Sequence, residues 1–146
     1  SRLLMVGDGP ERPEAEEHCR RLNLCDDIRF LGKQHEMEEI LAISDLFLLP
    51  SEYESFGLSA LEAMASGVPV LSTNAGGLPE INIHGVTGYM TAVGDTPKMT
   101  ELATHLLSDE NLLNTLKTNA KKHAQQFDID KIVPEYEALY NRFVVR

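Results

Sequence analysis

Residues 46–63 read LFLLPSEYESFGLSALEA, and this stretch decides the fold class. Its first four residues are apolar and predict a strand buried on both faces, which the following Pro-Ser pair ends. A helix is expected from Gly57 to Ser66, where Gly67 stops it. A buried strand that leads directly into a helix is typical of a parallel sheet covered by helices.

The same alternation continues on both sides of this stretch. Further strands are predicted at Leu3–Val6, Ile28–Leu31, Val68–Ser72 and Tyr89–Met90. Further helices are predicted at Glu11–Leu22, Met37–Ile43, after the turn Gly76–Pro79, and at Pro97–Leu107, Asp109–Gln126 and Ile129 to about Val144. With right-handed crossovers, this order predicts an α/β fold: a Rossmann-like parallel sheet with helices on both faces and extra helices at the carboxyl terminus.

The chain length is enough for one domain, so residues 1–146 are predicted to form a single domain. The first predicted strand begins almost at residue 1, and we therefore expect the domain to be truncated on its amino-terminal side. Residues 128–146 are expected to be a terminal helix with a wide apolar face. That face either packs on this sheet or covers a missing amino-terminal domain.

The charge and the cysteines exclude several function classes. The net charge is -10, from 13 basic and 23 acidic residues, which argues against binding nucleic acid or an anionic membrane. No stretch approaches the ~18 apolar residues of a membrane helix and no secretory leader is visible, so a cytoplasmic location is expected. Cys19 and Cys25 lack a CxxC spacing; two free thiols are favoured over a zinc site, and no metal is expected.

An acidic chain that binds a phosphorylated ligand needs a local device for the anion. The helix that begins near Gly57 offers one, because its first amides have no partner within the helix and carry the positive end of the dipole. Glu54 and Glu62 bracket this helix entrance, and their carboxylates can accept hydrogen bonds from sugar hydroxyls. The spacing alone fits equally well an acidic helix start followed by a solvated surface glutamate.

Seven motifs together carry a family resemblance. Glu54 and Glu62 have an E-x7-E spacing with SFGL between them. Six further motifs follow the same order along the chain as in the family: VGDGP at 6–10, FLG at 30–32, SDLFLLPS at 44–51, EAMASGVPV at 62–70, GGLPE at 76–80 and GVTGY at 85–89. The sequence thus resembles family 4 of the retaining glycosyltransferases, which have the GT-B fold. The resemblance covers residues 1 to about 94.

The resemblance implies a nucleoside diphosphate sugar as substrate, expected to be a UDP-sugar, without a further cofactor. Glu54 would hold hydroxyls of the donor sugar in the catalytic centre, and Glu62 would accept from the ribose hydroxyls. The chain around Lys33 and Gln34 would face the nucleotide base. The remaining donor contacts would come from one continuous segment, made of Ser55, Phe56, Gly57, Leu58 and Ser59.

Part of the family's machinery lies outside this sequence. In the family, an Arg and a Lys upstream of the VGDGP strand clamp the leaving diphosphate, and an amino-terminal domain binds most of the small-molecule acceptor. This sequence begins after that loop, so we expect the chain alone to be inactive.

A finer resemblance concerns the donor and the acceptor. The runs at 29–34 and 74–80, with His84-Gly85, are similar to the subgroup that transfers N-acetylglucosamine from UDP-N-acetylglucosamine to L-malate in bacillithiol biosynthesis. Two alternatives stay open: a GT-B enzyme of the mannosyltransferase or the glucan or sucrose synthase type, and a non-catalytic module that binds a nucleotide or a partner. NAD binding is disfavoured, because GDGPER at 7–12 lacks the third glycine of the dinucleotide fingerprint.

Overall fold

The computed structural model describes residues 1–143, and it confirms the expected α/β class with parallel strands and helices. The chain divides into two compact units, an amino-terminal unit of residues 1–39 and a carboxyl-terminal unit that begins at Ile40. Each is described by itself below. The single-domain extent expected for residues 1–146 stays a prediction.

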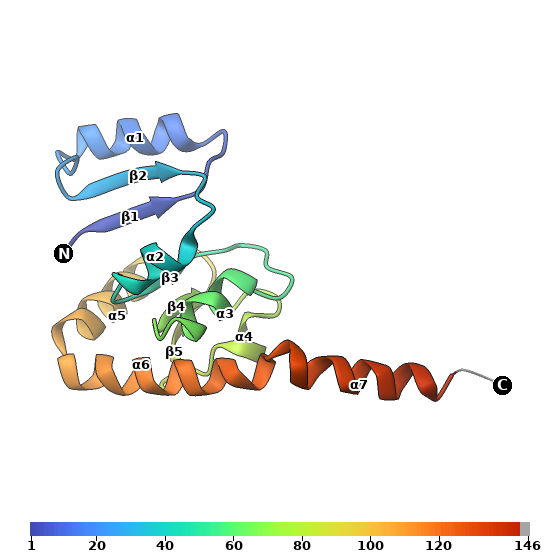
Figure 1. The fold of residues 1–146 in the computed structure, drawn as a ribbon. Helices are drawn as coiled ribbons and strands as arrows, with labels where there is room; N and C mark the ends of the chain where they lie inside the picture. The colour runs from blue at the N-terminus through green and yellow to red at the C-terminus, as the bar shows by residue number, and fades with distance from the viewer. Residues whose placement is uncertain (144–146) are drawn as a thin grey trace. The chain divides into compact units, whose positions relative to one another are not determined.

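The amino-terminal unit is one strand–helix–strand motif (Figure 1). It contains β1 (Leu3–Val6), α1 (Arg12–Arg21) and β2 (Ile28–Gly32), and the two strands pair in parallel. The apolar residues of β1 are partly accessible: Leu3, Met5 and Val6 are each 38–39% exposed. A two-stranded sheet that carries one helix cannot cover both faces of its strands.

The carboxyl-terminal unit contains a three-stranded parallel sheet. Helix α2 (Met37–Ala42) spans the division between the units, and β3 (Phe47–Leu49), α3 (Leu58–Ala65), β4 (Val70–Thr73), α4 (Leu78–Ile81) and β5 (Gly88–Thr91) follow. The strand order is β3-β4-β5, so β4 is the central strand and all four of its residues are buried. The expected burial of β3 on both faces was wrong: β3 lies at the edge of this sheet and Leu48 is 38% exposed.

Side-chain hydrogen bonds join the amino ends of β4 and β5. The buried Asn82 donates from Nδ2 to the carbonyl of Val70 (3.2 Å), to Ser72 Oγ (3.0 Å) and to the carbonyl of Tyr89 (3.1 Å). Its Oδ1 accepts from Thr87 Oγ1 at 3.1 Å. Both polar ends of the amide therefore have partners, as a buried polar group requires.

Three helices complete the described chain: α5 (Thr96–Ser108), α6 (Glu110–Ala124) and α7 (Ile129–Asn141), with a 3-10 turn at Gln125–Phe127 between the last two. Each of the three is capped by an aspartate whose side chain accepts from a backbone amide: Asp95, Asp109 and Asp128. The sequence predicted these helices to within three residues, although its expected end at Val144 lies outside the described residues. Within residues 1–143, no helix is long and apolar enough to cross a membrane.

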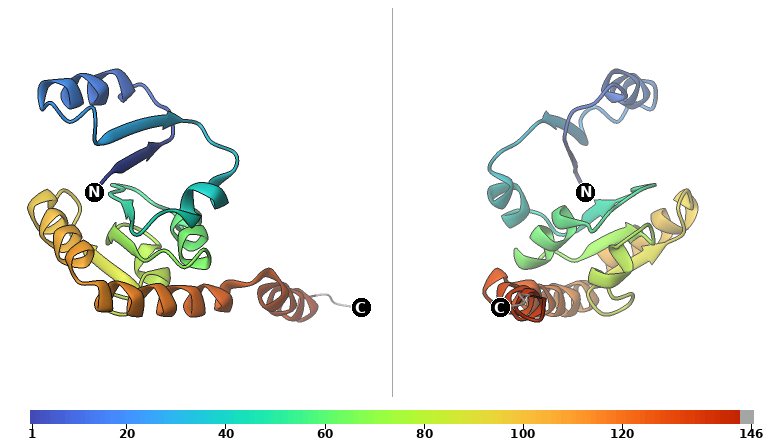
Figure 2. Two further views of the ribbon diagram at one scale, coloured as in Figure 1. Left: turned by 60° about the vertical axis from the view of Figure 1, so that its left-hand side comes forward. Right: turned by 90° about the vertical axis from the view of Figure 1, so that its right-hand side faces the viewer.

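The core of this unit lies between the sheet and its helices. Helix α3 packs against α6, the long helix along the bottom of this unit in Figure 1 and in the left-hand view of Figure 2. The apolar part of the core is formed by buried side chains of α3, β4, α4, α5 and α6: Ala60, Met64, Leu71, Leu78, Ile81, Leu106 and Leu116. This packing fixes the position of α3 on the sheet.

Helix α7 has the wide apolar surface that the sequence predicted. It extends beyond the sheet in Figure 1, and its exposed apolar residues include Ile129 at 71% and Tyr136 at 56%. Of the two expected roles for this face, packing on the sheet is not observed. The pairing of this face with a further domain stays a prediction.

Candidate functional site

The amino end of α3 lies where the sequence predicted a ligand-binding helix entrance. Gly57 is the N-cap residue, with φ 97° and ψ 45°, and within the described chain no side chain caps the helix. The first turn closes with the Leu61 amide donating to the Gly57 carbonyl at 3.0 Å. Leu58 and Ser59 are exposed, so the positive end of this helix faces an accessible surface.

Glycine is required at position 57 for two reasons. Its left-handed backbone disfavours any residue with a side chain. In addition, a Cβ atom there would lie 2.7 Å from Leu78 Cδ2 and 3.0 Å from Ile81 Cδ1. Helix α4 therefore packs directly on the start of α3, which fixes where the exposed amides of α3 point.

A second pair of glycines holds the segment that carries Glu54. A Cβ at Gly76 would lie 1.6 Å from the carbonyl oxygen of Glu54, and one at Gly77 would lie 2.6 Å from that of Ser55. The Gly77 amide donates to the Glu54 carbonyl at 3.2 Å. The turn between β4 and α4 thus contacts the backbone of the Glu54 segment with no side chain between them.

A side-chain hydrogen bond adds to this contact. Thr73, the last residue of β4, donates from Oγ1 to the carbonyl of Ser51 at 2.6 Å, across 22 positions of sequence. The sequence identified the glycine turn but gave no sign of this threonine's role. Together these contacts hold the β3–α3 loop at the carboxyl ends of the parallel strands, where open α/β sheets bind their ligands.

The two predicted carboxylates differ in their surroundings. Glu54 is half-buried in the β3–α3 loop, whereas Glu62 is exposed on α3. Glu62 lines a groove of about 290 Å³ together with Lys121 of α6 and Asp128. Lys121 is thus a cation in the same groove as a predicted ribose-binding carboxylate, and the sequence pattern did not indicate it. Binding roles for either glutamate stay predictions.

A larger groove, of about 820 Å³, adjoins the first and shares Leu58, Leu61 and Phe127 with it. Most of its lining is apolar and comes from α3 and α7, including Leu58 and Tyr136, together with Phe56 of the loop before α3. The Phe56 ring packs edge-on against Phe127 with 6.1 Å between ring centroids. Since the side chains of Phe56 and Leu58 line an apolar groove, any contact of theirs with a phosphate would come from the backbone.

Lys33 and Gln34, predicted to face a nucleotide base, belong to the amino-terminal unit. Both are exposed directly after β2, and Gln34 Nε2 donates to the Leu31 carbonyl at 2.6 Å. Their exposure leaves them accessible to a ligand. Because the two units are described separately, a shared site with Glu54 stays a prediction.

One cation of the amino-terminal unit was missed as a functional candidate. Arg12 Nε donates to Glu16 Oε1 at 2.8 Å, and its Nη1 lies 3.1 Å from where a Cβ on Gly32 would stand. The hydrogen bond to Glu16 raises the pKa of Arg12 above its ordinary value, so the guanidinium is charged at any physiological pH. It therefore places a positive charge at the carboxyl end of β2.

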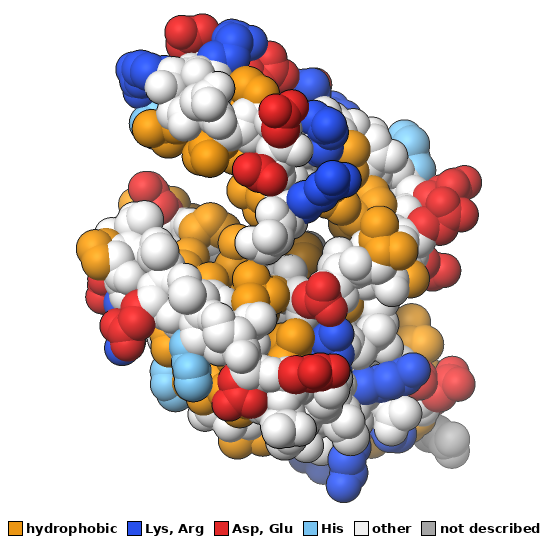
Figure 3. Space-filling model, turned by 90° about the vertical axis from the view of Figure 1, so that its left-hand side faces the viewer, with side chains coloured by type: hydrophobic (Ala, Val, Ile, Leu, Met, Phe, Trp, Pro, Cys, Tyr) orange, Lys and Arg blue, Asp and Glu red, His pale blue; other side chains and the backbone are white. Residues whose placement is uncertain are grey.

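On the face shown in Figure 3, basic and acidic side chains are interspersed. Within residues 1–143, no three His, Cys, Asp or Glu side chains are grouped so that they could hold a metal ion. His84 lies beside the amino end of β5, where its Nδ1 accepts from the Met90 amide at 3.0 Å, and thus away from the α3 entrance.

The sequence family described as glycosyl transferases group 1 matches residues 1–123. The chain belongs to this family. The resemblance found in the seven motifs is thereby confirmed.

Curated relatives of this glycosyl transferases group 1 chain agree with that assignment. It is 48% identical to the N-acetyl-alpha-D-glucosaminyl L-malate synthase of Bacillus anthracis over 96% of its own length and 37% of that protein. It is 33% identical to the 2-deoxystreptamine N-acetyl-D-glucosaminyltransferase of Niallia circulans, over 95% of the chain and 36% of that enzyme. The chain thus spans less than two fifths of these relatives.

Solved glycosyltransferase structures share the fold. The Anabaena protein HepE, crystallised in complex with UDP, superimposes with a TM-score of 0.89 at 29% identity, over 95% of this chain and 40% of HepE. Sucrose-phosphate synthase from Thermosynechococcus elongatus superimposes with a TM-score of 0.87 at 30% identity, over 97% of this chain and 38% of that enzyme. HepE has also been crystallised with UDP-glucose.

Proposed function

We propose that this chain forms the donor-binding part of a retaining glycosyltransferase whose donor is UDP-N-acetylglucosamine and whose acceptor is L-malate. The observation that carries the proposal is the exposed, glycine-capped amino end of α3, flanked by Glu54 and Glu62. The 48% identity to an N-acetyl-alpha-D-glucosaminyl L-malate synthase supports the choice of sugar and acceptor. The complexes of HepE with UDP and UDP-glucose support a uridine nucleotide.

In this proposal the leading amides of α3, at Leu58 and Ser59, donate to the α-phosphate of the donor. The carboxylate of Glu62 accepts from the ribose hydroxyls, and that of Glu54 accepts from the hydroxyls of the sugar. Lys33 and Gln34 contact the base. Catalysis comes from positioning the two substrates and from stabilising the charge on the departing diphosphate.

The strong acidity of the chain makes this local arrangement necessary. At a net charge of -10, the overall field repels a nucleoside diphosphate. Backbone amides at a helix start attract an anion without adding a side-chain charge. Leu78 and Ile81 of α4 leave no room for a side chain at residue 57. No side chain at that position can therefore cap the helix, and the leading amides of α3 stay accessible.

A nucleotide titration tests the site directly. The ¹⁵N-labelled chain is titrated with UDP, GDP and ADP, with inorganic phosphate as the control anion. We expect UDP to bind most tightly and the amide resonances of Leu58 and Ser59 to shift most among residues 40–143. Tighter binding of ADP or GDP would indicate a donor of the other GT-B types, and shifts confined to other segments would contradict the proposed site.

Glu62→Gln replaces the carboxylate by a neutral amide of nearly the same shape, which is a weaker hydrogen-bond acceptor for the ribose hydroxyls. We expect the dissociation constant for UDP to rise about 10-fold, which corresponds to about 1.4 kcal/mol. Glu101→Gln is the matched control, because Glu101 is an exposed glutamate on α5 whose carboxylate pairs with Lys98. A rise of equal size in the dissociation constants of both variants would contradict a specific ribose contact at Glu62, and a fall in both would show that weaker charge repulsion dominates the effect.

Turnover is expected to require more than these residues, because the curated relatives are more than twice as long as this chain. We expect the chain alone to bind UDP weakly and to make no product from UDP-N-acetylglucosamine and L-malate. Mass spectrometry of the reaction mixture checks this. Product formed by the chain alone would refute the proposal that turnover requires further residues.

A further inference from the structure

Two cysteines of the amino-terminal unit lie against each other. Cys19 is a buried residue of α1, and Cys25 is an exposed residue of the connection to β2. Cys19 Sγ donates to Cys25 Sγ at 3.6 Å. Neither residue has a part in the proposed donor site, and both belong to one unit, so their contact is independent of how the units are arranged.

Backbone contacts keep the two thiols close. The Leu24 amide donates to the Cys19 carbonyl at 3.1 Å, and Asn23 between them adopts a left-handed conformation with φ 58°. On the other side, Arg29 Nη1 donates to the Cys25 carbonyl at 2.9 Å. A disulfide has its sulfurs about 2.05 Å apart, so closing it requires a movement of roughly 1.5 Å, which rotation of two side chains can supply.

We propose that Cys19 and Cys25 form a reversible oxidation site that reacts with low-molecular-weight disulfides to give an intrachain disulfide. The exposed Cys25 reacts first and the buried Cys19 completes the reaction. The proposal rests on the short distance between the sulfurs, on their unequal exposure and on the loop that holds them. It is independent of the glycosyltransferase function.

The chemistry takes place in two exchange steps. In the first, the Cys25 thiolate attacks one sulfur of the small disulfide, so that a mixed disulfide forms and one small thiolate departs. In the second, Cys19 Sγ attacks Cys25 Sγ, the intrachain bond forms, and the second small thiolate departs and takes up the Cys19 proton. The two cysteines lose two electrons in total, and one small disulfide is reduced to two thiols.

The surroundings of Cys19 suit it to the second step. Burial raises the pKa of the Cys19 thiol, and its hydrogen bond to Cys25 acts in the same direction. Cys19 therefore stays protonated and unreactive toward reagents in solution, but it lies next to the sulfur that it must attack. A neighbouring resolving thiol also protects an exposed cysteine from irreversible oxidation.

Glutathione disulfide is the probe. The folded chain is incubated with it, free thiols are trapped by alkylation, and the intact mass is measured. We expect both thiols to disappear with the loss of two hydrogens and with no glutathione retained. Trypsin cleavage after Arg20 and Arg21 separates the cysteines, so the product should contain two peptides joined by a bond that dithiothreitol breaks.

Two variants separate the roles of the cysteines. Cys19→Ser should stop at the mixed disulfide and retain one glutathione on Cys25, whereas Cys25→Ser should stay unmodified as long as circular dichroism shows it folded. A wild-type chain that retains glutathione beside a free Cys19 would overturn the proposal, as would a disulfide between two chains. The wild-type peptide map decides the question even if neither variant folds.

Discussion

The two ends of the β3–β4–β5 sheet are held by different kinds of contact. At the amino end, the side chain of Asn82 joins β4 to β5 through hydrogen bonds with several partners. At the carboxyl end, Gly76 and Gly77 touch the backbone of Glu54 and Ser55 directly. A polar side chain thus fills the space at the amino end. At the carboxyl end, the glycine turn meets the Glu54 segment backbone to backbone.

The contacts at the amino end stabilise the sheet, whereas those at the carboxyl end also keep the α3 amides accessible to a ligand. Side-chain hydrogen bonds at the amino end are buried and satisfied, so they strengthen the sheet and leave nothing for a ligand. Backbone contacts between glycines and the Glu54 segment fix the β3–α3 loop while the α3 amides stay exposed. Variants at the amino end should therefore change stability alone, and variants at the carboxyl end should also change ligand binding.

The largest effect is expected for Gly76→Ala. The new Cβ would stand 1.6 Å from the Glu54 carbonyl oxygen, and the backbone at Gly76 has φ 51°. The β3–α3 loop would have to move, so we expect a loss of about 3 kcal/mol in the free energy of unfolding and loss of UDP binding. Urea denaturation and calorimetry measure the two quantities.

Gly94→Ala is the control for that variant. Gly94 has φ 78°, but a Cβ there would meet nothing within 4 Å. We expect a loss of only about 1 kcal/mol, from the left-handed backbone alone, with unchanged UDP affinity. Similar losses in the two variants would show that backbone strain, and not the contact with Glu54, dominates at Gly76.

Asn82→Ala comes next. It removes the hydrogen bonds to Val70 and Tyr89 and leaves buried polar groups without partners. We expect the free energy of unfolding to fall by about 2–3 kcal/mol, while the folded variant keeps its UDP affinity. Asn119→Ala, which removes one exposed hydrogen bond to Val86, should cost about 0.5 kcal/mol. A large loss of UDP affinity in the Asn82 variant would contradict the claim that contacts at the amino end of the sheet affect stability alone.

Two threonine variants give a smaller, matched comparison. Thr73→Val removes the hydrogen bond to Ser51 and should cost about 1 kcal/mol, together with some UDP affinity. Thr91 Oγ1, at the same end of β5, is buried and has no partner within the described chain. Thr91→Val should therefore leave stability unchanged or raise it in the same urea titrations. A loss in both variants would mean that the hydroxyl of Thr91 has a partner in solution.

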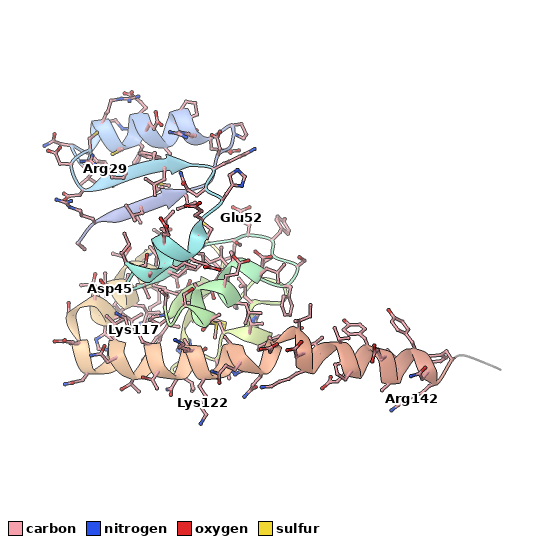
Figure 4. All side chains as sticks on the ribbon, in the orientation of Figure 1. Arg29, Asp45, Glu52, Lys117, Lys122 and Arg142 are labelled. Carbon is pink, nitrogen blue, oxygen red and sulfur yellow. The ribbon has the colours of Figure 1, made fainter. Side chains whose placement is uncertain are left out.

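The smallest effect is expected at the surface near the amino end. Lys117 Nζ of α6 lies 2.8 Å from Asp45 Oδ1, just before β3, and both residues are labelled in Figure 4. Because Asp45 is largely exposed, Lys117→Met should cost about 0.5 kcal/mol, and high salt should abolish the difference. A difference that persists at high salt would indicate packing by the lysine stem.

The order of strands and helices could be predicted from apolar periodicity and from turn residues, but burial could not. The apolar run at Phe47–Leu49 is an edge strand, whereas the central β4 contains Ser72 and Thr73. Burial of a strand depends on how many neighbours it has in the sheet, and a local window of sequence does not contain that number.

The position of the candidate site could be predicted from the sequence, but the contacts that hold it could not. The helix entrance at Gly57 could be located, because strand, glycine and helix are adjacent in the sequence. The contacts that hold it, from Thr73 to Ser51 and from Gly76 to Glu54, join segments about 22 positions apart and required the structure. Arg12 was visible only as a residue that interrupts a glycine motif, since its position beside Gly32 depends on the pairing of β1 with β2.

The missing side-chain cap of α3 has a consequence for its dynamics. Helices α5, α6 and α7 each begin with an aspartate that satisfies a leading amide, whereas α3 begins with glycine. The first turn of α3 is therefore expected to open more often, and its amide hydrogens should exchange quickly with solvent. An anion that occupied this end would replace the absent cap and slow that exchange, so the ligand would complete the helix that binds it.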